Sequence, residues 1–415
     1  MIIVIGGGPA GFFGAIHART ANPDTPVILL ERQGQVLRKV TVSGGGRCNV
    51  THACHDPRDL AAYYPRGGRA LIGPFSRWNP THTQAWFADR GIDLKTESDG
   101  RIFPVSDKSS TIVECLRGEA QSVGVEVRTG AAVTALQPRT GRPGFQVTLL
   151  DGTILGCDQV LLAIGGRTSG GGGAGGYDLA SGLGHTIVPP VPSLFSFHTR
   201  HPLFEGLAGV AVPDVGLTAQ SNALPRKGLQ RRGPLLVTHK GVSGPGVIQL
   251  SALGARAFHE TDYDFQLKVN WVPDLGPEDL DTRLREFATT EARKHVATRC
   301  PVDLPRRLWE ALVRTAGVSA ETRWSELGKK PRRALLDAVS GTTLHITGQA
   351  ANKEEFVTCG GVKLSEIDLK TMESKVCPGL FLAGEVLDID GLTGGFNFQA
   401  CWTTGNLAGD AMGGI

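Results

Sequence analysis

The chain has 415 residues, of which 40% are hydrophobic, and 56 residues are Gly. This length suits two domains, or one domain that carries an insertion, and the hydrophobic content supports a buried core. The formal net charge of +3 excludes a strongly acidic or basic chain, but residues 195–345 hold 21 Lys and Arg against 16 Asp and Glu.

The eight cysteines are scattered without a C-x-x-C pair, which argues against a disulfide framework and a zinc knuckle. We therefore expect reduced thiols and no metal site. No apolar run approaches the ~18 residues of a membrane span, and the sequence opens directly on an apolar strand without a signal peptide. A soluble, cytoplasmic protein without membrane contact is expected, and its oligomeric state is left open.

The opening residues carry the most specific local motif of the chain. Residues 2–5 form a continuous apolar run, as in a parallel strand buried on both faces, and residues 12–21 are a plausible helix. Between them lies a G-x-G-x-x-G motif formed by Gly6, Gly8 and Gly11. The first glycine permits a tight turn, the second lets a pyrophosphate approach the backbone, and the third allows the helix to pack closely on the strand.

A second apolar strand at residues 27–30 ends in Glu31, twenty residues beyond Gly11, where an acid hydrogen-bonds a ribose hydroxyl. Strand, glycines, helix, strand and acid together predict a dinucleotide site. An acid at this position argues against a 2′-phosphate. The pattern leaves FAD and NAD as alternatives.

A glycine-rich segment follows at residues 43–51, SGGGRCNVT. Its glycines give backbone freedom, Ser43 offers a hydroxyl, and Arg47 adds a fixed cation, a combination suited to a diphosphate or a flavin edge. A flexible surface loop is the alternative, although a plain linker rarely places Arg, Cys and Asn directly after three glycines. Cys48 is the thiol of most interest here.

Residues 159–164 form another apolar strand, which runs into Gly165 and returns the chain to the sheet. A second nominal G-x-G-x-x-G at Gly171, Gly173 and Gly176 has no strand directly before it and no acid suitably placed after it. It does not support a second dinucleotide domain.

Three prolines between residues 189 and 192 mark a boundary, and residues 195–345 are expected to form an insert with a β part and a helical part at about 275–340. Within it, residues 233–251 place His239 in a polar turn between apolar segments. His239 is a candidate acid or substrate ligand, and a hydrogen-bonded structural histidine is an equal alternative. Residues 1–194 and 346–415 would form one discontinuous domain.

Near the end of the sequence, an apolar strand at residues 379–384 leads into Glu385, and Gly394 and Gly395 precede a long helical stretch. The positive end of that helix suits the N1/O2 edge of a reduced isoalloxazine, where negative charge collects.

Together these segments resemble the BaiN/RdsA (YhiN-type) family of NAD(P)/FAD-dependent oxidoreductases over nearly the whole chain. The resemblance rests on GGGPAG, SGGGRCNVT, LLAIGG, LVTHKGVSGPGVIQLS, TMESK and LAGEVLDIDGLTGGFNFQ. It implies an α/β fold: a discontinuous, glutathione-reductase-like Rossmann domain that binds FAD, interrupted by a β-barrel-like and helical insert. The sequence departs from the family pattern at His52 and Ile164.

Carried over residue by residue, the resemblance implies FAD contacts at Gly6, Gly8, Ala10, Gly11, Glu31, Gly46, Arg47, Gly165, Gly384, Glu385, Gly395 and Asn397. Arg32, Ser43, Gly45, Val133, Ala163, Gly394 and Phe396 complete the predicted cofactor-binding set. NAD(P)H is the expected transient reductant.

Family activities include reduction of a carbon–carbon double bond conjugated to a carbonyl, in a steroid in one branch and in a ribosomal RNA uridine in another. The shared chemistry is hydride transfer from flavin N5 to the β-carbon, followed by protonation of the α-carbon. Cys48 is the first candidate proton donor, Cys359 the second and His239 the third; buried, inert thiols are the alternative.

Our first hypothesis is reduction of ribosomal RNA uridine to dihydrouridine. Two basic segments of the insert could grip RNA phosphates or be ordinary solvated surface: Arg226, Lys227, Arg231 and Arg232, and Lys329, Lys330, Arg332 and Arg333. A small-molecule ene-reductase acting on a steroid-like enone is the rival enzyme. A flavin-bearing RNA-binding or assembly protein without chemistry is the third alternative.

Overall fold

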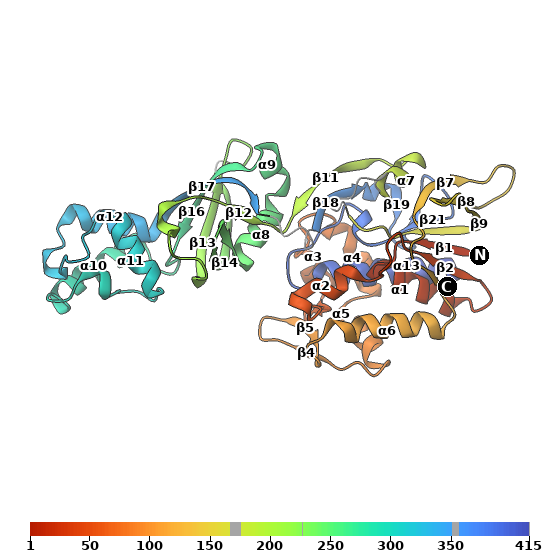
Figure 1. Ribbon diagram of the computed structural model, residues 1–415, viewed down its shortest axis with the longest axis horizontal. Helices are drawn as coiled ribbons and strands as arrows, with labels where there is room; N and C mark the ends of the chain where they lie inside the picture. The colour runs from red at the N-terminus through yellow and green to blue at the C-terminus, as the bar shows by residue number, and fades with distance from the viewer. Residues whose placement is uncertain (167–175, 226, 351–356, 415) are drawn as a thin grey trace. The chain divides into compact units, whose positions relative to one another are not determined.

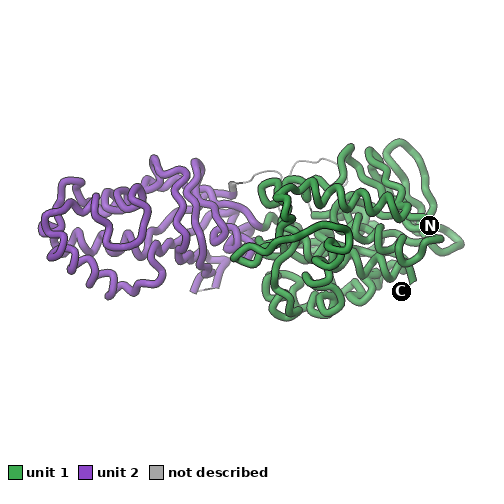
Figure 2. The backbone as a smooth tube through the Cα atoms, turned by 90° about the horizontal axis from the view of Figure 1, so that it is seen from below, with its two compact units in different colours: residues 1–193, 352–415 green, residues 194–351 purple. Residues whose placement is uncertain are grey.

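The computed structural model describes residues 1–415 except 167–175, 226, 351–356 and 415 (Figure 1). The second nominal glycine motif therefore falls largely outside the described residues. The chain divides into two compact units, which Figure 2 shows in different colours. Unit 1 comprises Met1–Ser193 and Asn352–Ile415, and unit 2 comprises Leu194–Ala351.

A seven-stranded sheet forms the centre of unit 1, in the order β19-β20-β21-β10-β1-β2-β6. Its parallel strands are β1 (Ile2–Ile5), β2 (Val27–Leu30), β6 (Glu126–Arg128), β10 (Gln159–Leu162) and β21 (Leu380–Leu382). All residues of β1 and β2 are buried, as expected for apolar strands covered on both faces. The antiparallel strands β19 (Ile367–Asp368) and β20 (Glu373–Ser374) extend one edge.

Helices α1 and α13 pack against each other closely, and both belong to the unit 1 core (Figure 1). A Cβ on Gly409 would lie 2.6 Å from the Gly14 carbonyl oxygen, so side chains are excluded where the two helices meet. The helices of unit 1 are α1 (Pro9–Ala21), α2 (Arg38–Gly46), α3 (Pro57–Ala61), α4 (Gly68–Arg77), α5 (Pro80–Ala88), α6 (Ser109–Ser122), α7 (Gly176–Gly182) and α13 (Phe396–Gly413).

Three small antiparallel sheets complete unit 1. The first contains β3 (Thr51–His52), β5 (Arg101–Pro104) and β4 (Leu94–Thr96); the second β7 (Val133–Pro138), β8 (Phe145–Leu149) and β9 (Ile154–Cys157); the third β11 (Ile187–Ser193) and β18 (Val357–Val362).

Unit 2 contains a closed antiparallel barrel in the order β12-β15-β14-β13-β16-β17. On β13 the buried residues Val215, Leu217 and Ala219 alternate with partly exposed ones, which is the period-two pattern of a strand with one buried face. The strands are β12 (Ser196–His198), β13 (Ala211–Gln220), β14 (Leu229–Thr238), β15 (Gly241–Ser243), β16 (Asp264–Asn270) and β17 (Thr342–Ala350).

The helices of unit 2 include α8 (Pro245–Leu253) and α9 (Ala255–Glu260), which follow β15, and a helical part with α10 (Pro277–Thr290), α11 (Arg306–Thr315) and α12 (Lys329–Gly341). Trp309 and Trp324 form the buried centre of the helical part, with ring centroids 6.4 Å apart. No helix in the described ranges is both long and apolar enough to cross a membrane.

Candidate dinucleotide site

The three glycines of the first βα turn differ in how much room a side chain would have. A Cβ on Gly6, whose φ is +114°, would lie 2.3 Å from the Ala163 oxygen, and one on Gly11 would lie 2.0 Å from the Gly6 oxygen. A Cβ on Gly8 would meet no atom within 4 Å. Gly6 and Gly11 are therefore fixed by packing, whereas Gly8 leaves the backbone open to an approaching group.

Gly8 is also the N-cap of α1, and no side chain caps the helix there. The N–H groups of the first helical turn are consequently available to an anion, and the helix dipole favours negative charge at this end. This arrangement fits the diphosphate of a dinucleotide.

Glu31 follows β2 and is partly exposed. Its Oε2 accepts a hydrogen bond from the Gly7 N–H at 2.8 Å, and its Oε1 accepts one from the Gln33 N–H at 2.8 Å. These bonds fix the carboxylate beside the glycine turn, and each oxygen keeps a lone pair for a ribose hydroxyl. Arg32 is exposed next to it, and Val133, at the start of β7, is half-buried.

The start of the glycine-rich segment falls within the bounds of α2, but its backbone is that of a loop. Ser43 has an extended ψ of 150°, and Gly44, Gly45 and Gly46 have φ of +58°, +68° and +84°. Gly45 and Gly46 are exposed, with no atom within 4 Å of an added Cβ. The Ser43 hydroxyl donates to the Val40 carbonyl at 2.9 Å, which orients its oxygen.

Arg47 is not a free cation. Its guanidinium forms ion pairs with Glu97 and Asp107, the second at 3.2 Å, and its Cζ lies 3.9 Å from the centroid of the Phe103 ring. Two carboxylates from a neighbouring segment thus already balance the charge that the sequence suggested for a diphosphate.

The carboxyl ends of β10 and β21 contribute the next group. A Cβ on Gly384 would lie 2.8 Å from the Ala10 Cβ, which places Gly384 directly beside the start of α1. Glu385 follows it, and a Cβ on Gly165 would lie 4.0 Å from the Glu385 Oε2. Ala163, at the end of β10, is buried. These predicted residues therefore converge at one edge of the sheet.

Lys39 belongs to this group, although sequence reasoning did not select it. Its Nζ donates to the Glu385 Oε2 at 2.5 Å, while the Thr358 N–H donates to the Glu385 Oε1 at 2.8 Å. Lys39 brings a cation close to the open turn. The only local signal was its place on the helix that leads into the glycine-rich loop.

The N-terminus of α13 is the remaining part of the site. Gly395 is its N-cap with a φ of +92°, and a Cβ there would lie 2.5 Å from the Thr51 oxygen. Gly394 also has a positive φ, of +133°. The Asn397 side chain accepts from the Gly391 N–H at 2.8 Å and donates to the Gly391 oxygen at 2.9 Å. Asn397 thereby holds the loop that leads into the helix.

Aromatic and polar contacts fix this helix end. The buried Phe396 ring stacks with Tyr63 at 4.3 Å and with His52 at 4.7 Å between centroids. Inside the core, the Gln399 Oε1 accepts from the Thr51 hydroxyl at 2.6 Å. The Trp402 indole donates to the Val50 oxygen at 2.9 Å. These hydrogen bonds hold the glycine-rich segment against α13.

The three candidate proton donors lie on separate elements. Cys48 is fully buried with a φ of +60°, and burial raises the pKa of its thiol to about 12. Cys359 is fully buried in β18. His239 is exposed in the turn between β14 and β15, in unit 2.

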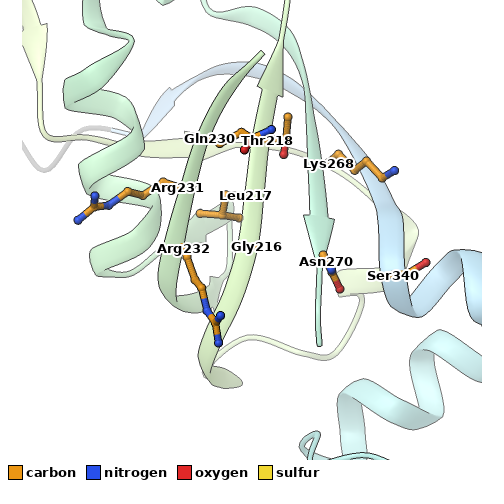
Figure 3. Close-up of a pocket in the computed structure, with 9 residues that line it drawn as sticks. All are labelled: Gly216, Leu217, Thr218, Gln230, Arg231, Arg232, Lys268, Asn270 and Ser340. Atoms are coloured by element: carbon orange, nitrogen blue, oxygen red, sulfur yellow. The ribbon is translucent and has the colours of Figure 1, made fainter. Parts of the chain in front are cut away.

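A polar concavity of about 490 Å³ lies on the barrel of unit 2 (Figure 3). Every residue predicted to bind the cofactor belongs to unit 1, whereas every residue that lines this concavity belongs to unit 2. It is lined by Gly216, Leu217, Thr218, Gln230, Arg231, Arg232, Lys268, Asn270 and Ser340.

A parallel sheet with an open glycine at its first turn, an acid after its second strand and a second helix, α13, packed alongside α1 defines a dinucleotide-binding Rossmann protein. The chain carries an inserted barrel unit in addition. It belongs to the HI0933-like protein Rossmann domain family, whose model matches residues 1–411.

Two curated relatives extend over nearly the whole chain. The 3-dehydro-bile acid delta(4,6)-reductase of Clostridium scindens is 31% identical over 415 residues, covering 98% of this chain and 98% of the relative. The ribosomal RNA dihydrouridine synthase of Escherichia coli is 31% identical over 411 residues, covering 97% of this chain and 95% of the relative.

Among solved structures, the 3-ketosteroid-delta4-(5alpha)-dehydrogenase of Rhodococcus jostii is similar in fold. It has 14% identity and a TM-score of 0.51, with 100% of this chain and 96% of that chain covered. The predicted family and the Rossmann fold class are confirmed, and the chain is an oxidoreductase. Membership of this family supports FAD as the cofactor.

Proposed function

We propose that the chain reduces a carbon–carbon double bond conjugated to a carbonyl with FAD, and that its substrate is a uridine of ribosomal RNA. The observation that carries the dinucleotide site is the first turn, where Gly6 and Gly11 are closed by packing and Gly8 alone is open. The choice of FAD over NAD is supported by the family to which the chain belongs. The similarity to a ribosomal RNA dihydrouridine synthase over 97% of the chain supports the substrate.

In this proposal different residues of unit 1 bind different parts of FAD. Gly8 and the first turn of α1 hold the diphosphate, and Glu31 binds the adenosine ribose. Lys39, paired with Glu385, lies beside them. The positive end of α13 at Gly395 would suit the N1/O2 edge of the isoalloxazine. When bound, FAD supplies the hydride.

Uracil is chemically suited to this reaction, because its C5=C6 bond is conjugated to the C4 carbonyl. A hydride adds to C6, a proton adds to C5, and the product has two more hydrogens than uridine. NAD(P)H is the proposed source of the electrons and becomes NAD(P)⁺.

The proton donor is proposed among Cys48, Cys359 and His239. A general acid is most effective when its pKa lies near the working pH. The pKa of about 12 at Cys48 keeps that thiol protonated but makes it a weak acid, which argues against Cys48 as the donor.

Mass spectrometry of ribosomal RNA from a strain without the gene tests the substrate. We expect one uridine to lack the two-hydrogen increment, and the increment to return with the wild-type gene but not with a Gly8→Ala variant. An unchanged RNA would reject ribosomal RNA as the substrate. Purified protein without flavin absorbance, and unable to take up added FAD, would reject the flavin chemistry itself.

A small-molecule enone is the second candidate substrate, because the bile acid reductase is also 31% identical and covers 98% of this chain. Turnover of a steroid enone with NAD(P)H, together with unmodified ribosomal RNA as a poor substrate, would favour it. A flavin-bearing RNA-binding protein without chemistry is less favoured, since both relatives are named for reactions.

A further inference from the structure

The basic residues of unit 2 differ in whether a carboxylate already balances them. Arg232 lines the barrel concavity (Figure 3). It pairs with Asp214 and also with Asp274 at 2.6 Å. Its neighbour Arg231 donates from Nε to the Gln249 side chain at 2.7 Å. An RNA phosphate at Arg232 would have to compete with two carboxylates.

The second basic segment, on α12, shows the same balance in part. Arg332 pairs with Asp281 at 2.9 Å, and Arg333 pairs with Asp337 at 3.2 Å. Arg226 of the first segment lies outside the described residues. Three of the described members, Arg232, Arg332 and Arg333, are therefore balanced by carboxylates. Lys227, Arg231, Lys329 and Lys330 have no carboxylate partner among the described residues.

A different group of cations meets at one end of the barrel. His198, the final residue of β12, pairs in register with Gly241 of β15, and the Thr199 N–H donates to the Lys240 oxygen at 3.1 Å. These backbone contacts bring the chain around Arg200 beside the β14–β15 turn that carries His239 and Lys240. We call His198, Arg200, His239 and Lys240 the barrel-end cluster.

The barrel-end cluster has no counterion among the residues that the structure describes. The side chains of Arg200, His239 and Lys240 are exposed and form no hydrogen bond or ion pair with any described residue. Burial lowers the pKa of His198, and the positive charges of Lys240 and Arg200 lower it further. The two charged groups that act on the His198 imidazole are thus both cations, Lys240 and Arg200. This agrees with the backbone contacts that bring these residues together.

We propose that the barrel-end cluster binds the phosphate backbone of the RNA substrate. This inference rests on the proposed function, and it assigns the exposed His239 to RNA contact. Arg200 and Lys240 gain a phosphate without breaking an ion pair in the described structure, unlike Arg232. The backbone contact between Thr199 and Lys240 holds the two segments that carry these cations beside each other before RNA binds.

RNA binding measured against salt concentration tests the proposal. The FAD-loaded full chain is titrated into a labelled single-stranded ribosomal RNA fragment, and fluorescence anisotropy is followed over a series of NaCl concentrations. The double variant Arg200→Gln/Lys240→Gln should bind about tenfold more weakly, and its slope of log K against log[salt] should fall by about 1.5, because each phosphate contact contributes about 0.7 to 0.9.

The matched control is Lys329→Gln/Lys330→Gln, which removes the same charge from two exposed lysines of α12 in the same unit. It should leave the slope near that of wild type. Flavin absorbance and melting temperature confirm that both variants are folded and loaded. Equal weakening by both double variants would show a net-charge effect and overturn the proposal.

The two proposals fail differently. Wild type that reduces RNA uridine, with a barrel-end variant that binds RNA normally, would reject the cluster and leave the proposed function standing. Wild type that reduces a small enone but neither binds nor reduces RNA would reject ribosomal RNA as substrate and the cluster with it.

Discussion

Replacement of Gly8 by alanine should separate cofactor binding from folding. The added Cβ would meet nothing within 4 Å, and the φ of −88° is one that alanine adopts readily. Loss of a glycine N-cap costs up to about 1 kcal/mol. The reduced entropy of the unfolded chain offsets about 0.4 to 1 kcal/mol of that cost. The melting temperature of the flavin-free protein should therefore stay close to that of wild type.

The same methyl group would occupy the approach to the backbone that the diphosphate needs. We expect FAD affinity to fall about 100-fold, which corresponds to about 2.7 kcal/mol. Quenching of flavin fluorescence on titration into flavin-free protein measures the dissociation constant, and differential scanning calorimetry measures stability.

Gly11→Ala is the matched control, because its Cβ would lie 2.0 Å from the Gly6 oxygen. A clash with backbone cannot be relieved by a side-chain rotation, so unfolding should become easier by about 3 kcal/mol or more. Gly8→Ala protein that binds FAD as wild type does, or that melts as early as Gly11→Ala, would refute this account of the turn.

Three further predictions concern Arg66, Glu366 and Cys48. Arg66→Met should lower the free energy of unfolding by about 3 to 5 kcal/mol, because the fully buried Asp390 loses the cation it pairs with. Urea unfolding should show that the double variant Arg66→Met/Asp390→Asn recovers part of this loss. If the effects of the two single substitutions simply add, the ion pair does not contribute as argued. Burial raises the pKa of Glu366, but hydrogen bonds from the Thr186 N–H and His185 hold it below its ordinary 4.5. The stabilisation it provides is present above that value and lost as pH falls through the lower folded pKa, so acid should destabilise wild type more than Glu366→Gln; parallel losses would contradict this. Cys48→Ala should keep most of its turnover in steady-state assays, whereas a loss of about 10²-fold would restore Cys48 as the acid.

The central part of the fold follows from short-range sequence patterns. Residues 2–5 and 27–30 are continuous apolar runs, and both are fully buried parallel strands. The turn between them could be predicted because each glycine meets a different steric requirement, and the G-x-G-x-x-G spacing alone identifies the three positions. The sequence pattern was sufficient to predict these strands and this turn because their formation depends on residues that are close together in the sequence.

Charge was harder to interpret, because counterions come from distant segments. Arg47 looked free in SGGGRCNVT, yet Glu97 and Asp107 balance it across the β5 region. Lys39 was likewise not recognised, because only folding brings it to its partner Glu385. A count of basic residues along the sequence cannot distinguish a neutralised cation from one that can still bind an anion.

The position of β10 beside β21 has a consequence for how the protein is made. All of unit 2 lies between these strands in the sequence, although their backbones are hydrogen-bonded neighbours. While the ribosome adds the barrel and its helices, the half-built sheet presents β10 as an apolar, unpaired edge, which is a site for aggregation or chaperone capture. Because α13 is also translated after the insert, its part of the predicted cofactor site is absent during this period. A nascent chain stalled within unit 2 should therefore be recovered without flavin.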